Sequence, residues 1–392
     1  MTGSVAGVRN AAALEPWYGA VRGRANTPAN AWVFADSIGE GVWVSAPIYQ
    51  NRWLAKLQTL LRAWHPTPGL GAGGVGFMPA YYADALISDE TTRTGGGTFQ
   101  ETSWIWGPGG RCLLVPGTST GTVTYPAQTI TSFRVWHGKN NFLGGQGAAI
   151  VDGVTQVTTM NGSAAAKSDG HFQDYTVTPG SHTVAVKCTT AGSAFPLNGV
   201  QFFNGDETRG IQIWDATHSG MNATHLTQSS LDPMYQLLGV VKPRLIMLAL
   251  GTNDRAGYTV GDYLTNIAAN VSRIATAMSG VTYTLFLIGG YEPGAAPTAT
   301  PGKWAQMMAG LSDMAVGNVA YASVQPPWPE LRADGSTNAG LMFEASNPVH
   351  LTSAGATLYA EVIADALRLP ESRRPSTRRS TYLPGPPKVV FS

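Results

Sequence analysis

The spacing of apolar residues changes twice along this 392-residue chain, and the change limits the folds open to it. Residues 31–90 and 208–368 alternate short apolar runs with amphipathic stretches whose apolar residues recur at steps of three and four. Between them helical periodicity disappears, and short β-branched runs are separated by turn residues. Alternating strands and helices predict a parallel sheet with right-handed crossovers, whereas closely spaced strands predict an antiparallel sandwich. The sequence therefore predicts an α/β domain interrupted by a β-rich insertion.

These changes set the expected domain boundaries. The α/β domain takes residues 31–92 and 208–368, and the inserted β-sandwich takes 93–207. Residues 1–30 are a lead-in that is expected to pack on the outside of the α/β domain. Residues 369–392, with arginines among prolines, are expected to form an extended tail.

Composition narrows the classes of partner. Apolar residues make up 43% of the chain, which is ample for buried cores, and charged residues only 12%. The formal net charge of +1 predicts neither nucleic acid nor a membrane surface as partner. No run approaches the roughly 18 apolar residues of a membrane-spanning helix. The N-terminus lacks a basic region followed by an apolar core, so we expect no signal peptide.

The few residues suited to metal binding lack the spacing of a metal site. Cys112 and Cys188 are far apart in the sequence. They are predicted to be buried free thiols, with a disulfide that closes the β-rich block as the alternative. His218 and His225 lie close together, but no acid or third ligand follows at a useful spacing. We therefore expect no metal and no cofactor.

A short apolar run at Ala31–Phe34 ends abruptly in Asp36-Ser37, and a Gly-Glu-Gly turn follows. This is how a chain leaves a buried strand and presents one hydroxyl at the strand's C-terminal edge. Ser37 is the candidate nucleophile. A serine hydroxyl reacts poorly until a base takes its proton, so the rest of the chain must supply that base.

Three more candidates lie near the ends of predicted strands. Gly220 comes after the run at 211–214, Asn253 after the continuous apolar run at 245–250, and His350 before the last helix. Each alone is commonly a turn former or a helix cap. In doubly wound sheets, however, sites form at the C-terminal ends of the strands. Their joint occurrence in this order favours a catalytic set, with Asp36 and Asp254 bonding to loop backbone.

These four segments resemble the four sequence blocks of the SGNH/GDSL hydrolases, a family of serine esterases. The matching segments are Phe34–Gly41, His218–Gly220, Gly251–Asp254 and Asn347–His350. The resemblance covers the two α/β parts and not the insertion. It implies a flavodoxin-like three-layer α/β/α fold with a parallel sheet.

The resemblance also implies a role for each residue. His350 would take the proton from Ser37 as general base and return it to the leaving alkoxide as general acid. The oxyanion would be held by the backbone N–H groups of Ser37 and Gly220 and by the side-chain amide of Asn253. Losing one such donor typically costs ~3–4 kcal/mol of transition-state stabilisation.

The chain departs from the family pattern at two positions. Ala35 replaces a glycine, which is a small change, and Asn347 replaces the aspartate three residues before the histidine. In a serine protease, replacing the orienting aspartate with asparagine costs about 10⁴ in rate. Three interpretations remain open. Asn347 accepts from His350 through its amide oxygen as a catalytic residue, a backbone carbonyl or an acid such as Glu344 or Asp334 orients His350, or catalysis is reduced or lost.

The insertion carries a looser resemblance. Its segments 151–153 and 180–184 are similar to galactose-binding-type jelly rolls attached to carbohydrate-active enzymes. The resemblance makes its aromatic residues candidates for stacking on sugar faces, and burial in the sandwich core is the alternative. The substrate-binding candidates are Trp104 and Trp136, with Trp106 and His137 beside them.

The sequence thus predicts a serine ester hydrolase that removes a short acyl group, most simply acetyl, from a carbohydrate or cell-envelope polymer. Two alternatives remain. One is a carbohydrate-binding or structural surface protein on a degenerate hydrolase scaffold, and the other is a lipase acting on long acyl chains. Composition resembles that of tail-associated proteins of actinobacterial phages, which implies a virion-associated or extracellular location. A cytoplasmic or otherwise exported bacterial esterase is the alternative.

Overall fold

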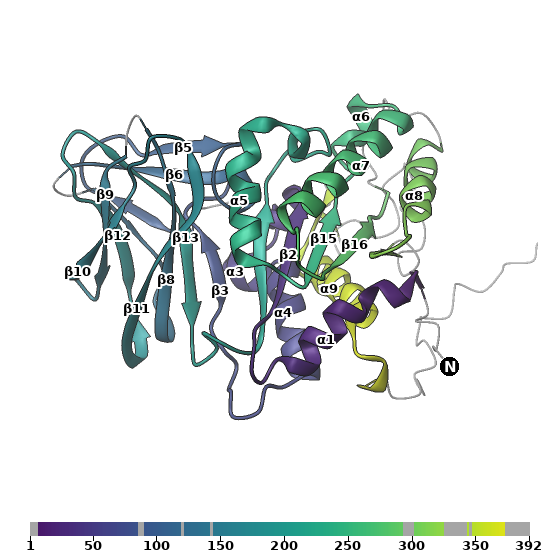
Figure 1. Cartoon of the computed structure of the whole chain (residues 1–392), viewed down its shortest axis with the longest axis horizontal. Helices are drawn as coiled ribbons and strands as arrows, with labels where there is room; N and C mark the ends of the chain where they lie inside the picture. Colours follow the sequence, from purple (N-terminus) through teal and green to yellow (C-terminus); the bar gives the residue numbers. More distant parts are fainter. Residues whose placement is uncertain are drawn as a thin grey trace, which may run out of the picture.

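The computed structural model describes residues 7–84, 90–118, 121–141, 144–292, 302–324, 343–344 and 347–372. Figure 1 shows an α/β part on the right and a part made of antiparallel strands on the left, with helix α5 (Asp232–Val241) between them. The chain is therefore a mixed α/β protein, as the two changes in apolar spacing predicted.

The α/β part is built on one six-stranded sheet in which five adjacent strands run parallel. Numbered along the chain, the parallel strands lie in the order 2-1-3-4-5, and a short antiparallel strand is added at the far edge. Their interiors are apolar and buried on both faces, which explains the continuous apolar runs. In spatial order the strands are β1 (Val8–Arg9), β17 (Val319–Ser323), β16 (Thr284–Gly289), β15 (Leu245–Ala249), β2 (Ala29–Ala35) and β14 (Ile211–Thr217).

Helices cover both faces of this sheet, giving three layers. Side chains of one face, such as Val33 and Met247, join a core with helices α1 (Glu15–Gly23), α4 (Trp53–Trp64) and α9 (Ser353–Leu367). Their strand neighbours, such as Phe34 and Leu248, point the other way because side chains alternate along a strand. They pack against α5, α7 (Val260–Ala277) and α8 (Lys303–Asp313).

Shorter elements complete the α/β part. They are helices α2 (Ser37–Glu40), α3 (Ile48–Asn51) and α6 (Asp254–Gly257), strands β18 (Phe343–Glu344) and β19 (Asn347–Leu351), and 3-10 turns η1 (Ala11–Leu14), η3 (His225–Thr227), η4 (Ser229–Leu231) and η5 (Pro370–Ser372). The remaining turn, η2 (Pro108–Gly110), belongs to the antiparallel part.

The N-terminal segment is more than an external lead-in. Helix α1 buries Trp17, Tyr18 and Val21 almost completely in the α/β core. The Trp17 indole N–H also donates to the backbone oxygen of Leu367, 3.1 Å away, in the last helix. Apolar periodicity did not predict this helix because it is only nine residues long and ends in glycine, a weak helix former. Helix α5 was not predicted either.

Two antiparallel sheets form the other part. They share one apolar cluster, to which Val123 and Val186 of the first sheet and Phe133 and Phe202 of the second contribute. The first sheet has the order β10 (Val154–Asn161), β9 (Gln146–Val151), β12 (Val184–Cys188), β7 (Thr122–Thr124), β4 (Thr92–Thr94). The second has the order β11 (Ser168–His182), β8 (Gln128–Lys139), β13 (Ala194–Phe203), β6 (Arg111–Pro116), β5 (Gln100–Ser103), with β3 (Gly76–Pro79) paired to β13.

Local details of this part bear on three predictions. The expected hairpin is present between β9 and β10, and its turn residues Asp152 and Gly153 both have positive φ. Cys112 and Cys188 are buried and free, which was the first of the two alternatives. Strand pairing begins at β3 rather than at the expected start of the insertion, because β3 pairs with β13.

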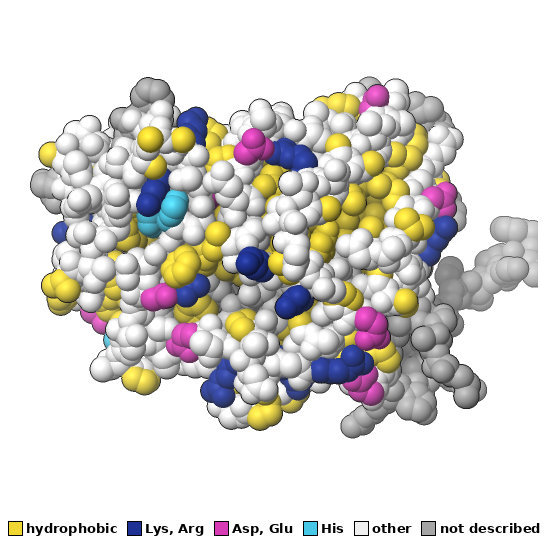
Figure 2. Space-filling view, in the orientation of Figure 1, with side chains coloured by type: hydrophobic (Ala, Val, Ile, Leu, Met, Phe, Trp, Pro, Cys, Tyr) yellow, Lys and Arg dark blue, Asp and Glu magenta, His cyan; other side chains and the backbone are white. Residues whose placement is uncertain are grey.

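The surface carries few charges. On the face shown in Figure 2, uncharged and apolar side chains predominate, and charged side chains lie among them singly or in small groups. Among the helices that the structure describes, none combines the length and the apolarity needed to cross a bilayer.

The burial of Trp17 gives a test of the N-terminal helix. We expect Trp17→Ala to lower the free energy of unfolding by about 3–5 kcal/mol, because it removes a large core side chain and leaves a cavity. Glu15→Gln, on the exposed face of the same helix, should change it by no more than about 0.5 kcal/mol. Urea unfolding followed by fluorescence measures both. Equal stabilities for the two variants would contradict this placement of α1.

Candidate functional site

Strand order places a crevice at the C-terminal ends of β2 and β15. The chain leaves β2 toward β14 on one side and leaves β15 toward β16 on the other. Ligands of open α/β sheets bind where the connections diverge in this way. Ser37 follows β2 and Asn253 follows β15, so both lie at this crevice.

Ser37 is the first residue of helix α2, and its turn is tightly constrained. The Asp36 side chain caps the helix by accepting the N–H of Ile38 at 2.9 Å, so its predicted bond to loop backbone is present. A Cβ at Gly39 would lie 2.5 Å from the Ala35 Cβ and 2.7 Å from the Thr217 side chain. Only glycine lets this helix approach β14 so closely, and the approach holds the Ser37 hydroxyl at the edge of the sheet.

His350 reaches Ser37 from the other end of the chain. Its Nε2 lies 2.9 Å from the Ser37 Oγ, within hydrogen-bond distance. It sits near the end of β19, and Thr352 caps the following helix α9 by accepting the N–H of Gly355. The Tyr291 hydroxyl donates to the Val349 backbone oxygen, which helps to fix the strand beside His350. The structure thus assembles a hydroxyl and an imidazole in the geometry of a nucleophile and its base.

Burial and one carboxylate act on His350 in opposite directions. Burial lowers the pKa of the imidazole from its usual 6.5, and the nearby Asp84 carboxylate raises it in part. The imidazole is therefore mostly neutral at pH 7, as a general base must be. Asp84 was not predicted from the sequence, because a single acid in a loop after a strand carries no recognisable signal.

The expected orienting partners of His350 are not in the described part of the chain. Its Nδ1 is buried and has no hydrogen-bond partner among the described residues. Asn347 lies in β19, but its side chain and that of Glu344 fall outside the described part, and so does the whole of Asp334. The three interpretations of the asparagine substitution therefore all remain predictions.

Asn253 bonds to the loop that carries Gly220, and that loop is attached to strand β2, which precedes Ser37. Residues 218–221, the Gly220 loop, are tied to β2 by the His218 N–H, which donates to Ala35 O at 2.9 Å. Gly220 has a φ of 79°, and a Cβ there would meet no atom within 4 Å, so it faces open space. The Asn253 amide donates to Met221 O at 2.9 Å, which leaves its second hydrogen for another acceptor.

Asp254 supports the same region by accepting the Ala223 N–H at 2.9 Å, so its predicted bond to loop backbone is also present. The backbone N–H of Gly220 makes no hydrogen bond within the described residues. This N–H and the second hydrogen of the Asn253 amide thus have no acceptor within the described residues, and their role as oxyanion donors stays a prediction.

The Gly220 loop also rests on Glu40, to which the sequence assigned no role. The Glu40 side chain is 0% exposed and accepts the Ser219 N–H at 2.7 Å and the Ala83 N–H at 2.6 Å. Arg111, from the antiparallel part, donates to the same carboxylate at 2.7 Å. Burial raises the pKa of Glu40, and the charge of Arg111 opposes that rise.

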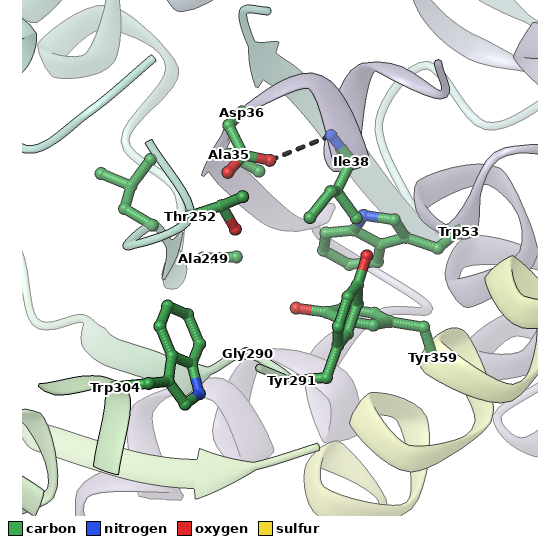
Figure 3. A pocket seen from close by; sticks show the side chains of 12 residues that line it. Ala35, Asp36, Ile38, Trp53, Ala249, Thr252, Gly290, Tyr291, Trp304 and Tyr359 are labelled. Atoms are coloured by element: carbon green, nitrogen blue, oxygen red, sulfur yellow. Dashed lines mark hydrogen bonds between the residues drawn. The ribbon is translucent and has the colours of Figure 1, made fainter. Parts of the chain in front are cut away.

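A small cavity lies behind the nucleophile turn. Figure 3 shows Asp36 and Thr252 on one side of it and the rings of Tyr291 and Tyr359 on another. Its volume of about 20 Å³ is enough for one water molecule. Burial raises the pKa of Asp36 to about 7, although the N–H of Ile38 lowers it in part.

The two predicted sugar-stacking residues are not free to stack. His218 and His225 lie on the Trp104 indole at centroid distances of 3.8 and 4.0 Å, nearly parallel to it. Two imidazoles this close to one indole must occupy opposite faces, or they would overlap. Trp136 is 2% exposed, and its indole N–H donates to Gln201 inside the protein. Both expectations were wrong, as were those for the buried Trp106 and His137.

Alternation of side chains could not have revealed this outcome for Trp104, because the residues that cover it come from a distant segment of the chain. The same stack also separates His218 from His225 by a whole indole. They do not converge on a common ion.

Comparison with known proteins supports the fold. No family model and no curated protein matches the chain. A solved structure of a peptidoglycan O-acetylesterase is similar over 90% of this chain and 95% of that one, with a TM-score of 0.63 and 16% sequence identity. At this identity the likeness shows a shared fold.

Two family 2 carbohydrate esterases are also similar. One, with a carbohydrate-binding domain, is from Corynascus thermopiles (Myceliophthora fergusii): 14% identity, 69% of this chain, 98% of that one, TM-score 0.31. The other is from Cellvibrio japonicus: 12% identity, 71% of this chain, 96% of that one, TM-score 0.30. These two TM-scores are too low to carry an argument.

The environment of His350 predicts its titration. In an NMR pH titration of the full chain, we expect His350 to titrate below 6.5, because burial disfavours the imidazolium. Asp84→Asn should lower this pKa further, because it removes the negative charge that favours the protonated ring. His182, whose pKa its hydrogen bond to Asp152 raises, serves as the internal control and should titrate above 6.5. A His350 pKa that rises in Asp84→Asn would contradict this account.

Proposed function

We propose that this protein is a serine ester hydrolase that removes a short acyl group, acetyl in the simplest case, from a carbohydrate or cell-envelope polymer. The observation that carries the proposal is the 2.9 Å approach of His350 Nε2 to Ser37 Oγ at the divergence of β2 and β15. Gly220 and Asn253, beside this pair, complete the set that ester hydrolysis needs.

The first half-reaction forms an acyl-enzyme. The Ser37 Oγ attacks the ester carbonyl carbon while His350 Nε2 takes the hydroxyl proton. The carbonyl oxygen becomes an oxyanion, which the N–H groups of Ser37 and Gly220 and the Asn253 amide stabilise. When the intermediate collapses, the C–O bond to the sugar breaks. His350 gives its proton to the departing alkoxide, so the sugar leaves as an alcohol and the acyl group stays on Ser37.

The second half-reaction releases the acid. Water attacks the acyl carbon, and His350 Nε2 takes one of the water protons. The same donors stabilise the second oxyanion. Collapse breaks the bond to Ser37 Oγ, which recovers its proton from His350. The products are the free carboxylic acid and the deacylated polymer, and neither half-reaction needs a cofactor.

The shared fold supports the proposed substrate class. The solved structure that shares this fold over most of both chains is that of a peptidoglycan O-acetylesterase. We extend the proposal to the antiparallel sheets as an inserted jelly roll that recognises carbohydrate, in a flavodoxin-like SGNH hydrolase domain. A virion-associated or extracellular location remains a prediction of the sequence.

One observation favours a second candidate function. The buried Nδ1 of His350 lacks a partner in the described part of the chain, and an unsupported imidazole is a weaker base. A carbohydrate-binding protein on a degenerate hydrolase scaffold is therefore the alternative. A lipase acting on long acyl chains is distinguished by comparing esters of increasing length.

Hydrolysis of p-nitrophenyl acetate and release of acetate from O-acetylated peptidoglycan test the proposal. We expect turnover by the wild type and a fall of at least about 1,000-fold in Ser37→Ala, because no nucleophile remains. Ser279→Ala, at an exposed serine beyond helix α7, should match the wild type. Turnover that persists in Ser37→Ala would refute this mechanism. Absence of turnover in the wild type would favour the binding protein, and faster cleavage of long-chain esters would favour the lipase.

The oxyanion role of Asn253 predicts a separate effect. We expect Asn253→Ala to lower kcat by about 100- to 1,000-fold with little change in KM, because the donor acts mainly in the transition state. Asn26→Ala, in an exposed turn, is the matched control. Steady-state kinetics on p-nitrophenyl acetate measure both variants. A rise in KM with unchanged kcat would assign Asn253 to ground-state binding instead.

A further inference from the structure

The Gly220 loop is held by the antiparallel part as well as by the parallel sheet. His218 Nδ1 donates to the backbone oxygen of Gly109 at 2.8 Å, in turn η2. Gly109 itself packs directly on the backbone oxygen of Thr217, where a side chain could not fit. Trp104 lies between His218 and His225. The segment from 104 to 111 therefore supports the loop that carries the Gly220 N–H.

One buried carboxylate connects this loop to the nucleophile. Glu40 lies three residues after Ser37 on the same short helix. Its Oε2 accepts the Ser219 N–H at 2.7 Å, and its Oε1 accepts the Ala83 N–H at 2.6 Å. Ser219 in turn donates its hydroxyl to Asp84 at 2.7 Å. Besides the backbone bond from His218 to Ala35, a single side chain thus links the Ser37 turn to the Gly220 loop.

Arg111 keeps that carboxylate charged and in place. Its Nη1 donates to Glu40 at 2.7 Å, and its Nη2 lies 2.9 Å from Asp215, which also pairs with Arg52. We call these four residues the Glu40 cluster. It contains two carboxylates and two guanidinium groups, all almost fully buried. Because the charges balance, removing either arginine would leave a buried carboxylate without its counter-charge.

The position of this cluster matters for chemistry as well as for stability. An oxyanion donor acts only when it lies about 2.7–3.1 Å from the oxygen that becomes charged. A shift of about 1 Å in a group that holds the reacting atoms can cost about 100-fold in rate. The Ser219 N–H that Glu40 binds is one residue from the Gly220 N–H. Any relaxation of the Glu40 contact therefore moves an oxyanion donor.

We propose that Glu40 and Arg111 are positioning residues for the oxyanion hole. The antiparallel part, through Arg111, holds the Glu40 carboxylate, and Glu40 orients the Gly220 loop relative to Ser37. This inference rests on the proposed esterase function and goes beyond it. The inserted sheets become part of the catalytic machinery, in addition to any role in recognition.

Two variants test the proposal in the full chain. Glu40→Gln keeps the shape but replaces one acceptor oxygen with an NH₂ donor, and both oxygens of Glu40 face only donors, so one of these contacts is lost. We expect kcat on p-nitrophenyl acetate to fall by about 10- to 100-fold while KM changes little. Arg111→Met should cause a similar loss at neutral pH, and Glu40→Gln keeps the proposal testable if Arg111→Met fails to fold.

The pH profile of Arg111→Met separates positioning from a general loss of structure. Glu40 faces Arg111 and, beyond it, Asp215, whose negative charge raises the pKa of Glu40. Without Arg111 that pKa rises further, so a larger fraction of Glu40 is protonated at a given pH, and the protonated acid loses an acceptor for one of the two N–H groups. Raising the pH restores the carboxylate. We therefore expect kcat of this variant, relative to wild type, to recover as pH increases.

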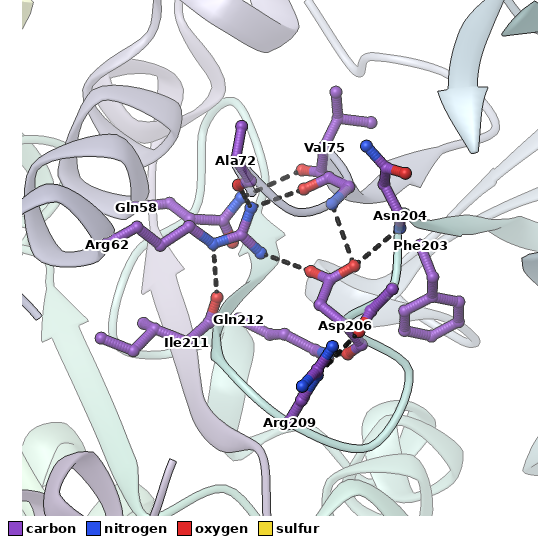
Figure 4. Close-up of polar contacts among 12 residues, drawn as sticks. Gln58, Arg62, Ala72, Val75, Phe203, Asn204, Asp206, Arg209, Ile211 and Gln212 are labelled. Atoms are coloured by element: carbon purple, nitrogen blue, oxygen red, sulfur yellow. Dashed lines mark hydrogen bonds and ion pairs between the residues drawn. The ribbon is translucent and has the colours of Figure 1, made fainter. Parts of the chain in front are cut away.

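The Arg62–Asp206 pair provides a matched control (Figure 4). Arg62 donates to Asp206 at 2.8 Å, and both side chains are largely buried. Arg62 also donates to the oxygen of Ile211, at the start of β14, whereas Asp215 lies near its end. At about 3.3 Å per residue, the two pairs are roughly 13 Å apart along the strand. We expect Arg62→Met to lower Tm like Arg111→Met and to leave kcat unchanged at every pH.

Hydrogen exchange of the Ser219 amide, measured without substrate, completes the test. We expect faster exchange in Glu40→Gln and Arg111→Met than in Arg62→Met. If the wild type hydrolyses esters but these two variants lose no more kcat than Arg62→Met, positioning is refuted and the esterase function stands. If the wild type shows no Ser37-dependent turnover, the proposed function fails. In that case the Ser219 exchange rates still test whether Glu40 holds the Gly220 loop. Exchange rates in Glu40→Gln and Arg111→Met equal to that of the wild type would refute this structural role too.

Discussion

The buried ion pairs of the Glu40 cluster join the two parts of this protein at the point where the chemistry is expected. Burying four charges is costly unless each finds a partner, and here every carboxylate faces a guanidinium. Burial alone would raise the pKa of Asp215, but the charges of Arg111 and Arg52 outweigh it and hold that pKa well below its usual value. Such a cluster tolerates little displacement, because a small shift leaves a charge without compensation. The relative placement of the two parts is therefore constrained most strongly beside Ser37.

Much of the parallel domain was predictable because its signals are local. The apolar run before Asp36, the run at 245–250 and the amphipathic helices each identify an element without reference to the rest of the chain. Strand ends then bring Ser37, Gly220 and Asn253 to one edge, since parallel strands share their direction. His350 was predictable from its motif, and the structure places its imidazole next to Ser37.

The residues that support the site were not predictable from sequence, because their roles depend on partners distant in the chain. In the sequence, Glu40 looks like a surface glutamate in a turn. Only the folded chain places Arg111 and the Ser219 N–H in contact with its carboxylate. In the sequence, Trp104 looks like a residue that could stack on a sugar. In the structure, two histidines from another segment cover both of its faces. Helix α1 is too short for its periodicity to stand out, and packing into the core of the α/β part stabilises it.

The pairing of β3 with β13 has a consequence for how the chain folds. Strands β2 and β14 are neighbours in the parallel sheet, yet the whole antiparallel part separates them in sequence. Closing so long a loop directly would be entropically unfavourable and slow. Because β3 and β13 are the first and last strands of the second antiparallel sheet and pair with each other, that part brings its own ends together once it forms. The loop that must then close to pair β2 with β14 contains fewer residues, because only the segments from β2 to β3 and from β13 to β14 remain in it. An early-forming insertion would therefore favour pairing at the centre of the parallel sheet.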